Sequence, residues 1–227
     1  MSLAARLAEV DGRIADAARA AGRDPSALTR IVVTKFHPAS LVEELYGLGV
    51  RDVGENRQQE LSRKVAEVGD REGLRWHFIG QAQTNKARAI RAASSAVHSL
   101  DRARLADALH AAAEPGEPVL DVLLQVNLTD DPGRGGVAPD DLVSLAEHTA
   151  RLSSLRVRGV MAVAPLDEPP APAFARLRAL SDAVLTVVPD AEWISAGMTA
   201  DFAEAIAAGA THLRIGSAIT GPRPLRG

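Results

Sequence analysis

The stretch at residues 31–68, IVVTKFHPASLVEELYGLGVRDVGENRQQELSRKVAEV, holds the pattern that decides the fold. A short apolar run at 31–35 is followed by a segment of helical period at 41–48, a second short run at 51–54 and a second helical segment at 57–68. Strands that alternate with helices form parallel sheets, because parallel neighbours need a long crossover connection. The stretch therefore predicts two strand–helix units of a parallel sheet.

The same alternation continues along the rest of the chain. Further candidate strands occur at 75–80, 96–100, 119–128, 157–163, 192–195 and 212–215, with helical segments between them at 84–93, 101–113, 140–152, 174–188 and 199–208. Eight such units predict a closed (β/α)8 TIM barrel. An open, doubly wound sheet is the alternative, but no G-x-G-x-x-G fingerprint follows the first strand.

An extra helix is predicted ahead of the first strand, because apolar residues recur there at three- and four-residue spacing. These residues are Leu3, Leu7, Val10, Ile14 and Ala18. We therefore expect one α/β domain over residues 1–227, a barrel with one added N-terminal helix.

Composition excludes several classes of protein. The 227 residues carry 26 basic and 29 acidic side chains, a formal net charge of −3, which argues against a dedicated nucleic-acid binder. The absence of cysteine excludes disulfides and thiol catalysis, and the six histidines show no metal-ligand spacing, so no metal is expected. No apolar run reaches the roughly 20 residues of a membrane span. The N-terminal segment lacks the apolar centre of a secretory signal. We expect a cytoplasmic monomer.

Lysine is scarce, since only Lys35, Lys64 and Lys86 stand among the 26 basic residues. Unlike arginine, lysine can lose its proton and act as a nucleophile. Lys35 ends the first strand on the same face as Ile31 and Val33, where partial desolvation at a barrel mouth would favour a neutral amine able to form a Schiff base. An outward-pointing Lys35 is the alternative. We expect Lys64 on the solvated face of a polar helix, and Lys86 either beside an anion or carboxylate or as a plain surface charge.

Small residues follow the last two predicted strands, in SAGMT at 195–199 and RIGS at 214–217. Barrels often bind phosphate in these two loops, because backbone N–H groups approach an anion closely there. Thr199 is a candidate N-cap of the next helix. Ordinary turn chemistry is the alternative interpretation.

An amine and an anion site on one rim suit two ligand classes, a sugar-phosphate aldehyde and pyridoxal 5′-phosphate. Arg214 shares a strand face with His212 and Gly216, where its guanidinium would keep a pyridine nitrogen unprotonated. A structural ion pair is the alternative role for Arg214.

Other polar residues are interpreted as structural. His77 and His98 lie inside predicted strands and are expected to be hydrogen-bonded core groups. His110 and His148 are expected on helix surfaces. The loop DDPGRGG at 130–136 carries Arg134, which either reaches an anion at the site or belongs to an ordinary turn.

A series of motifs then follows in order along the chain. They are VTK at 33–35, GEN at 54–56, WHFIG at 76–80 with QTNK at 83–86, HSLDR at 98–102, RGVM at 158–161, SAGMT at 195–199 and RIGSAI at 214–219. Together they resemble the pyridoxal phosphate homeostasis protein family, over residues 31–221.

The resemblance implies a barrel similar to the N-terminal domain of alanine racemase, with pyridoxal 5′-phosphate held as a covalent aldimine on Lys35. It implies that Arg214 lies near the pyridine nitrogen and that Asn56 lies close to the cofactor. The complete set of implied cofactor-binding residues is Lys35, Asn56, Met161, Ser195, Gly197, Met198, Thr199, Arg214, Gly216 and Ser217. The implied function is storage and delivery of the cofactor, with apo enzymes that use it as partners and no catalytic turnover.

Several residues depart from the family pattern. His37 and Arg134 stand where lysines are usual, and Arg57 stands where an aromatic residue is usual. The usual Gly-x-Leu-Gln reads GQAQ at 80–83. The family resemblance also suggests a second route by which the cofactor docks, through accessory lysines. That route lacks these lysines here, because arginine attracts anions but forms no imine.

A racemase of weak activity is the alternative function, and an aldolase-like lyase, which leaves the family motifs unexplained, is a third. A two-base racemase needs an acid–base group opposite the lysine, commonly a tyrosine from another domain. The one tyrosine, Tyr46, falls inside the predicted helix at 41–48. We therefore expect a cofactor carrier without efficient racemisation.

Overall fold

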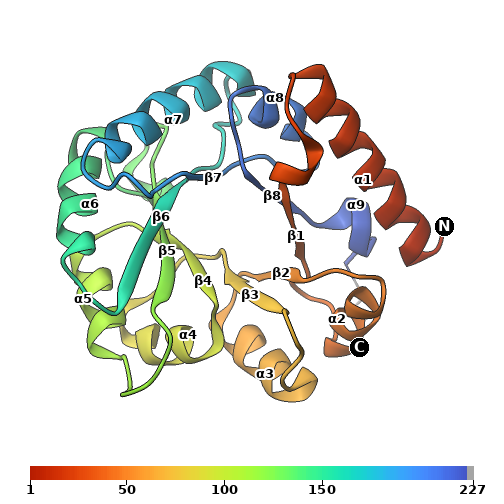
Figure 1. Cartoon of the computed structure of the whole chain (residues 1–227), viewed down its shortest axis with the longest axis horizontal. Helices are drawn as coiled ribbons and strands as arrows, with labels where there is room; N and C mark the ends of the chain where they lie inside the picture. Colours follow the sequence, from red (N-terminus) through yellow and green to blue (C-terminus); the bar gives the residue numbers. More distant parts are fainter. Residues whose placement is uncertain (224–227) are drawn as a thin grey trace.

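Eight parallel strands close into a barrel in sequence order in the computed structural model, which describes residues 1–223 (Figure 1). The strands are β1 Thr29–Val33, β2 Asp52–Glu55, β3 Arg75–Phe78, β4 Ala96–Leu100, β5 Leu120–Gln125, β6 Leu155–Met161, β7 Trp193–Ser195 and β8 His212–Ile215. Register pairs such as Val32 with Val53, and Val32 with Ile215, join β1 to both β2 and β8. The predicted (β/α)8 barrel is confirmed.

Helices form a ring outside the strands (Figure 1). They are α1 Leu3–Ala20, α2 Ala39–Gly47, α3 Gln58–Val68, α4 Ala87–Ala93, α5 Ala103–Ala111, α6 Leu142–Ala150, α7 Pro170–Leu185, α8 Phe202–Ala207 and α9 Ser217–Thr220. The predicted start of the last long helix at residue 199 is wrong, as is Thr199 as its N-cap. Residues 198–201 form a turn in which the Met198 N–H donates to the Asp201 carboxylate (2.6 Å), so α8 begins after Asp201.

The extra N-terminal helix α1 is confirmed, and it packs on α8 and α9. Its buried side is the predicted apolar stripe, from Leu3 to Ala18. Arg6 of α1 also donates to the Ile219 carbonyl of α9 (2.6 Å). Helix α1 therefore packs beside the junction at which β8, the last strand, pairs with β1, the first strand.

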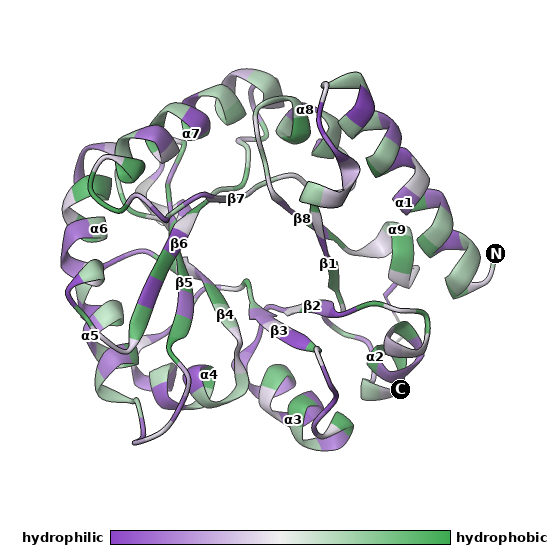
Figure 2. Cartoon of the chain, viewed as in Figure 1, coloured by the Kyte–Doolittle hydropathy of each residue, from purple (hydrophilic) through white to green (hydrophobic). Residues whose placement is uncertain are grey.

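Alternation along the strands divides the buried residues into two groups. Val32, Val53 and Phe78 face the helices and belong to one continuous apolar cluster between sheet and helix ring. The neighbouring positions point into the barrel lumen, and several of them are polar, including His77 and His98. Figure 2 shows this mixture as hydrophilic positions within strands such as β3 and β6. The lumen of this barrel is thus partly polar, whereas the layer between the strands and the helices is mainly apolar.

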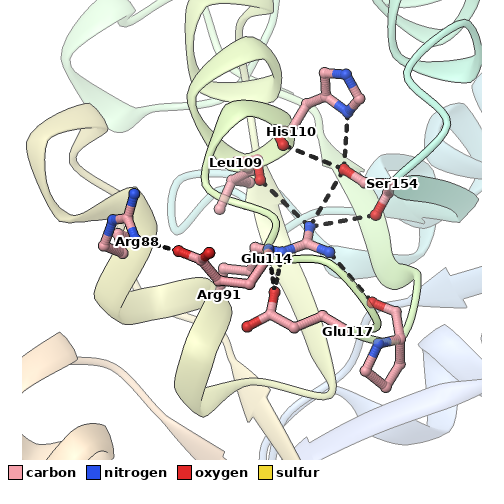
Figure 3. A network of polar contacts seen from close by, with 8 residues as sticks. Arg88, Arg91, Leu109, His110, Glu114, Glu117 and Ser154 are labelled. Atoms are coloured by element: carbon pink, nitrogen blue, oxygen red, sulfur yellow. Dashed lines mark hydrogen bonds and ion pairs between the residues drawn. The ribbon is translucent and has the colours of Figure 1, made fainter.

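Arg91 of α4 is buried and ties three connections together on the outside of the barrel (Figure 3). Its guanidinium donates to Glu117 (3.0 Å) and to the backbone carbonyls of Leu109, Pro118 and Ser154 at 3.2–3.3 Å. One side chain therefore fixes the end of α5, the loop before β5 and the turn before β6.

No helix within residues 1–223 has the length and apolarity that crossing a membrane would require.

Candidate functional site

Lys35 lies just after β1, on the rim formed by the carboxyl ends of the strands. Its side chain is half-buried, and within residues 1–223 its ammonium has no hydrogen-bond or ion-pair partner, while the Phe36 ring lies 5.8 Å from Nζ. Asn56, Met161 and Ser195 lie at or next to the same ends of β2, β6 and β7. The fold therefore brings these predicted residues to one rim, where barrels carry their active sites.

Phe36 is the one non-glycine residue with a positive φ (71°) among the described residues. Its N–H donates to Glu60 (3.1 Å), and its ring lies near the cations of Arg223 (4.0 Å) and Arg57 (5.5 Å) as well as that of Lys35. A backbone held in a costly conformation beside a candidate nucleophile is typical of functional sites. The several cations make this part of the rim attractive to an anion. The sequence alone gives no signal for the strained backbone.

The prediction that Lys64 is a solvated surface charge is wrong. Lys64 is fully buried and forms an ion pair with Glu55 (2.5 Å), while it also donates to the Thr34 carbonyl (2.7 Å). The Thr34 hydroxyl donates to the same Glu55 oxygen (2.6 Å). Burial raises the pKa of Glu55, although Lys64 and Thr34 oppose that shift. The pair holds together the ends of β1 and β2, and so the base of the rim from which Lys35 and Asn56 extend.

A continuous chain of hydrogen bonds crosses the lumen beneath the rim. Arg214 Nη1 donates to Ser195 Oγ (2.7 Å), which lies 2.9 Å from His98 Nδ1. His98 Nε2 lies 2.9 Å from His77 Nδ1, and His77 Nε2 lies 2.8 Å from Asp52 Oδ1. These five residues come from β8, β7, β4, β3 and β2, so the chain spans the barrel.

One arrangement of protons satisfies every contact in this chain with neutral imidazoles. Ser195 donates to His98, His98 donates through Nε2 to His77, and His77 donates through Nε2 to the Asp52 carboxylate. Burial lowers the pKa of His77 and lowers that of His98 strongly, which agrees with neutral rings. The chain thus links the Arg214 guanidinium at one end to the Asp52 carboxylate at the other through uncharged side chains. The expectation that His77 and His98 are hydrogen-bonded core groups is confirmed.

Arg214 itself is buried, and burial lowers its pKa to about 10, so it stays charged at neutral pH. Its Nη2 donates to the Ala162 carbonyl (2.9 Å) after β6. The fixed guanidinium retains further N–H donors for a ligand. The Ser195 hydroxyl, by contrast, contacts Arg214 and His98 within the lumen, and its place in the implied cofactor-binding set stays a prediction.

The two glycine loops after β7 and β8 lie side by side, because the Arg214 N–H donates to the Gly197 carbonyl (2.9 Å). Gly197 has a φ of +90°, and a Cβ there would come within 2.7 Å of the Ala205 Cβ. Gly216 is the N-cap of α9, and its carbonyl accepts from Ile219 and Thr220. The N–H groups of Ser217 and the next residue precede the first such bond and suit an anion.

Asn56 carries a buried side-chain oxygen, Oδ1, without a hydrogen-bond partner within residues 1–223. Its backbone is held by close packing, because a Cβ on Gly80 would lie 1.9 Å from the Asn56 carbonyl oxygen. A buried polar atom without a partner is costly and is often satisfied by a ligand or water. Gly80 therefore fixes Asn56 as a candidate ligand-binding group.

Two other residues singled out in the sequence, Arg134 and Tyr46, have surroundings of their own. Arg134 lies with Asp131, Leu166 and Arg176 around a hollow of about 730 Å³ between the loops after β5 and β6. Tyr46 lies on α2, and its hydroxyl donates to the Glu72 carbonyl (3.1 Å). The structure thus gives Tyr46 an outer, structural contact.

The fold and this rim define a class of protein, the barrels that resemble the N-terminal domain of alanine racemase. The model of the family "Alanine racemase, N-terminal domain" matches residues 15–224. The pyridoxal phosphate homeostasis protein of Pseudomonas aeruginosa is 44% identical over 225 residues, covering 98% of this chain and 96% of that protein. This chain belongs to the pyridoxal phosphate homeostasis protein family.

Solved structures agree with this assignment. PipY of Synechococcus elongatus, in a structure described as having PLP bound, superposes with a TM-score of 0.84 at 33% identity, covering 97% of this chain and all (100%) of that one. Its structure without PLP gives a TM-score of 0.87. Alanine racemase from Streptomyces coelicolor gives 0.76 at 19% identity, a likeness of fold, and this chain spans 58% of its length.

Proposed function

We propose that this chain binds pyridoxal 5′-phosphate at the rim and holds it through a covalent bond to Lys35, as a cytoplasmic carrier that stores and delivers the cofactor. The observation that carries the proposal is the half-buried Lys35 ammonium without a partner in residues 1–223, on one rim with Arg214 and the two glycine loops. The names of the relatives support it, and they describe homeostasis rather than a reaction.

The residues present fit the chemical parts of this cofactor. Asn56 offers a buried acceptor without a partner, which suits a phenolic hydroxyl. Arg214 offers a fixed positive charge, which suits a pyridine nitrogen that stays unprotonated. The loops at Gly197 and Gly216 offer close backbone approach, which suits a phosphate. Met161, buried at the end of β6, adds an apolar contact to this set.

Each residue has a definite task in this proposal. Lys35, once deprotonated, bonds to the aldehyde carbon, and the aldehyde oxygen leaves as water. Ser195 acts as a positioning residue, because its hydroxyl holds the Arg214 guanidinium. Met198 and Thr199 border the phosphate loop, where Asp201 already accepts the Met198 N–H. Ser217 supplies the first N–H of α9. We further propose that the carrier is a monomer and that its partners are apo enzymes.

Borohydride trapping tests the proposal directly. The purified chain, supplied with pyridoxal 5′-phosphate, is expected to gain a visible absorption band, and reduction should fix the cofactor mass on the Lys35 peptide. Lys35→Ala should lose the band and the label, whereas Arg63→Gln, an exposed change on α3, should keep both. A wild-type protein that stays colourless, or a label on Lys64 or Lys86, would contradict the proposal.

A further inference from the structure

Lys86 is the lysine that neither the cofactor nor the buried ion pair explains. It is half-buried at the N-cap of α4, and within residues 1–223 its ammonium has no hydrogen-bond or ion-pair partner. Lys86 also ends the 3-10 turn at Thr84–Lys86. No acidic side chain of the described residues pairs with it.

Lys86 borders a cavity of about 170 Å³ between the loops after β2 and β3, at the N-terminal ends of α3 and α4. The floor of this cavity is apolar, formed by the buried side chains of Phe78 and Ile90. Around it lie five carboxamides and a second cation. These are Asn56, Gln58, Gln59, Gln81, Gln83 and Arg57. None of the lining residues is acidic, so the cavity combines two positive charges with many neutral hydrogen-bonding groups.

Most of these lining groups are available to a ligand. Of the four glutamines, Gln58 alone has a side-chain bond within the described part of the chain, to Ser62 (2.8 Å). The nearest acid to Arg57 is Glu60, at 3.8 Å, and Glu60 does not line the cavity. Arg57 is also the N-cap of the eleven-residue helix α3, and its side chain makes no capping bond, so the first N–H groups of α3 add to the same positive region.

The size of the cavity limits the ligand. Pockets that hold drug-sized ligands usually have volumes of about 300–1,000 Å³, and this cavity is smaller, at about 170 Å³. It therefore suits a small molecule.

We propose that this cavity, the Lys86 pocket, is a second binding site of the protein, for a small oxyanion. The charge of Lys86 and Arg57 attracts the oxyanion, the carboxamides donate hydrogen bonds to it, and Phe78 and Ile90 support its apolar part. Two sources share this chemistry, inorganic phosphate and the carboxylate of a free amino or 2-oxo acid. Because Asn56 borders the pocket and also belongs to the proposed cofactor site, an occupant would lie next to the cofactor.

Calorimetric titration of the full chain with phosphate, L-alanine and pyruvate in separate experiments, at matched ionic strength, tests the proposal. At least one of the three is expected to bind the cofactor-free wild type saturably. Lys86→Gln should weaken that binding about tenfold or more, and the exposed change Arg57→Gln should weaken it as well. Arg88→Gln is the matched control, since Arg88 lies on the same helix but pairs with Glu114 at the surface, and its affinity should equal that of the wild type.

Binding of phosphate alone would identify a phosphoryl ligand, and binding of alanine or pyruvate alone would identify a carboxylate ligand. No binding of any of the three, or equal affinity in Lys86→Gln and the wild type, would overturn the site. The visible absorbance of cofactor-loaded Lys86→Gln is recorded in parallel and is expected to be that of the wild type. A failure of the second site is thereby distinguished from a failure of the cofactor site.

Discussion

Lys64 shows that the position of a residue in a helix predicts its burial better than the charge of its side chain does. Between Leu61 and Val68 it stands three residues after one buried position and four before the next, which is the spacing of a core-facing stripe. Its charge suggested a solvated face, but its spacing placed it toward the sheet. The second indication of a buried ion pair in the sequence was Glu55, which is the last residue of a short buried strand. The pair was therefore readable from the sequence once spacing was given priority over side-chain charge.

We predict that Lys64→Met destabilises the protein strongly. The change removes the ammonium from a fully buried pair and leaves the Glu55 carboxylate with the Thr34 hydroxyl as its donor. Breaking a buried ion pair by removing one partner typically costs about 3–5 kcal/mol. Urea unfolding followed by circular dichroism measures this loss of unfolding free energy.

Two further variants separate the pair from a general effect of changing α3. Lys64→Met combined with Glu55→Gln removes both charges and should recover part of the lost stability. Arg63→Gln changes the neighbouring exposed residue and should shift the unfolding free energy by less than about 0.5 kcal/mol. A Lys64→Met protein as stable as Arg63→Gln would show that the pair contributes little.

At the scale of elements, the alternation of short apolar runs with helical segments predicted the strands and helices well, because parallel strands and their crossover helices have distinct hydrophobic periods. The beginning of α8 was predicted too early. The turn before it depends on a specific side-chain contact, from the Met198 N–H to Asp201, which no periodic pattern records. The Arg91 network was missed for a similar reason, since its acceptors are mostly backbone carbonyls of distant segments.

We predict that Arg91→Met loosens the connections around α4 (Figure 3). The change removes the donor of the Leu109 and Pro118 carbonyls, while the Ser154 carbonyl keeps the Leu120 N–H as a donor. A buried group left unsatisfied costs about 1–3 kcal/mol. We expect a loss on the order of 3 kcal/mol in unfolding free energy, together with faster hydrogen exchange in residues 112–119.

Arg88→Gln is the control for this prediction as well, because the Arg88 pair with Glu114 is exposed and exposed pairs contribute little. It should change both readouts only slightly. Equal stability and equal exchange in the two variants would show that the Arg91 contacts do not hold these connections.

At the scale of the whole molecule, the sequence predicted which strand ends form the rim, since strand order fixes that in a closed parallel barrel. It did not predict which side chains meet across the lumen. Ser195 and His98 are far apart along the chain, and their contact depends on barrel stagger and on the register shift between β4 and β5. The contacts of the Ser195 hydroxyl with Arg214 and His98 therefore had no signal in the sequence, and Lys35, Asn56 and Arg214 remain proposed cofactor contacts.

The buried histidines of the barrel make stability depend on pH. Burial lowers the pKa of His77, His98 and His212, and that of His212 falls to about 3. In the unfolded chain a histidine has a pKa near 6.5. Below about pH 6.5 the unfolded state therefore binds protons that the native state does not, and unfolding becomes more favourable. For His212 this loss of stability continues as pH falls to about 3, at up to about 1.4 kcal/mol per pH unit.

His212→Phe isolates this contribution, because it removes the titrating ring but keeps an aromatic group against Trp193, whose ring centroid lies 4.3 Å from that of His212. Carboxylates and the other two histidines also titrate, so the measured quantity is the difference in slope between variant and wild type. Unfolding free energies from urea titrations between pH 7.5 and pH 4.5 should fall less steeply in His212→Phe, by about one proton. Thr186→Ser, an exposed change that removes no titrating group, should keep the wild-type slope. Parallel slopes in His212→Phe and the wild type would mean that His212 is protonated in the native barrel at these pH values.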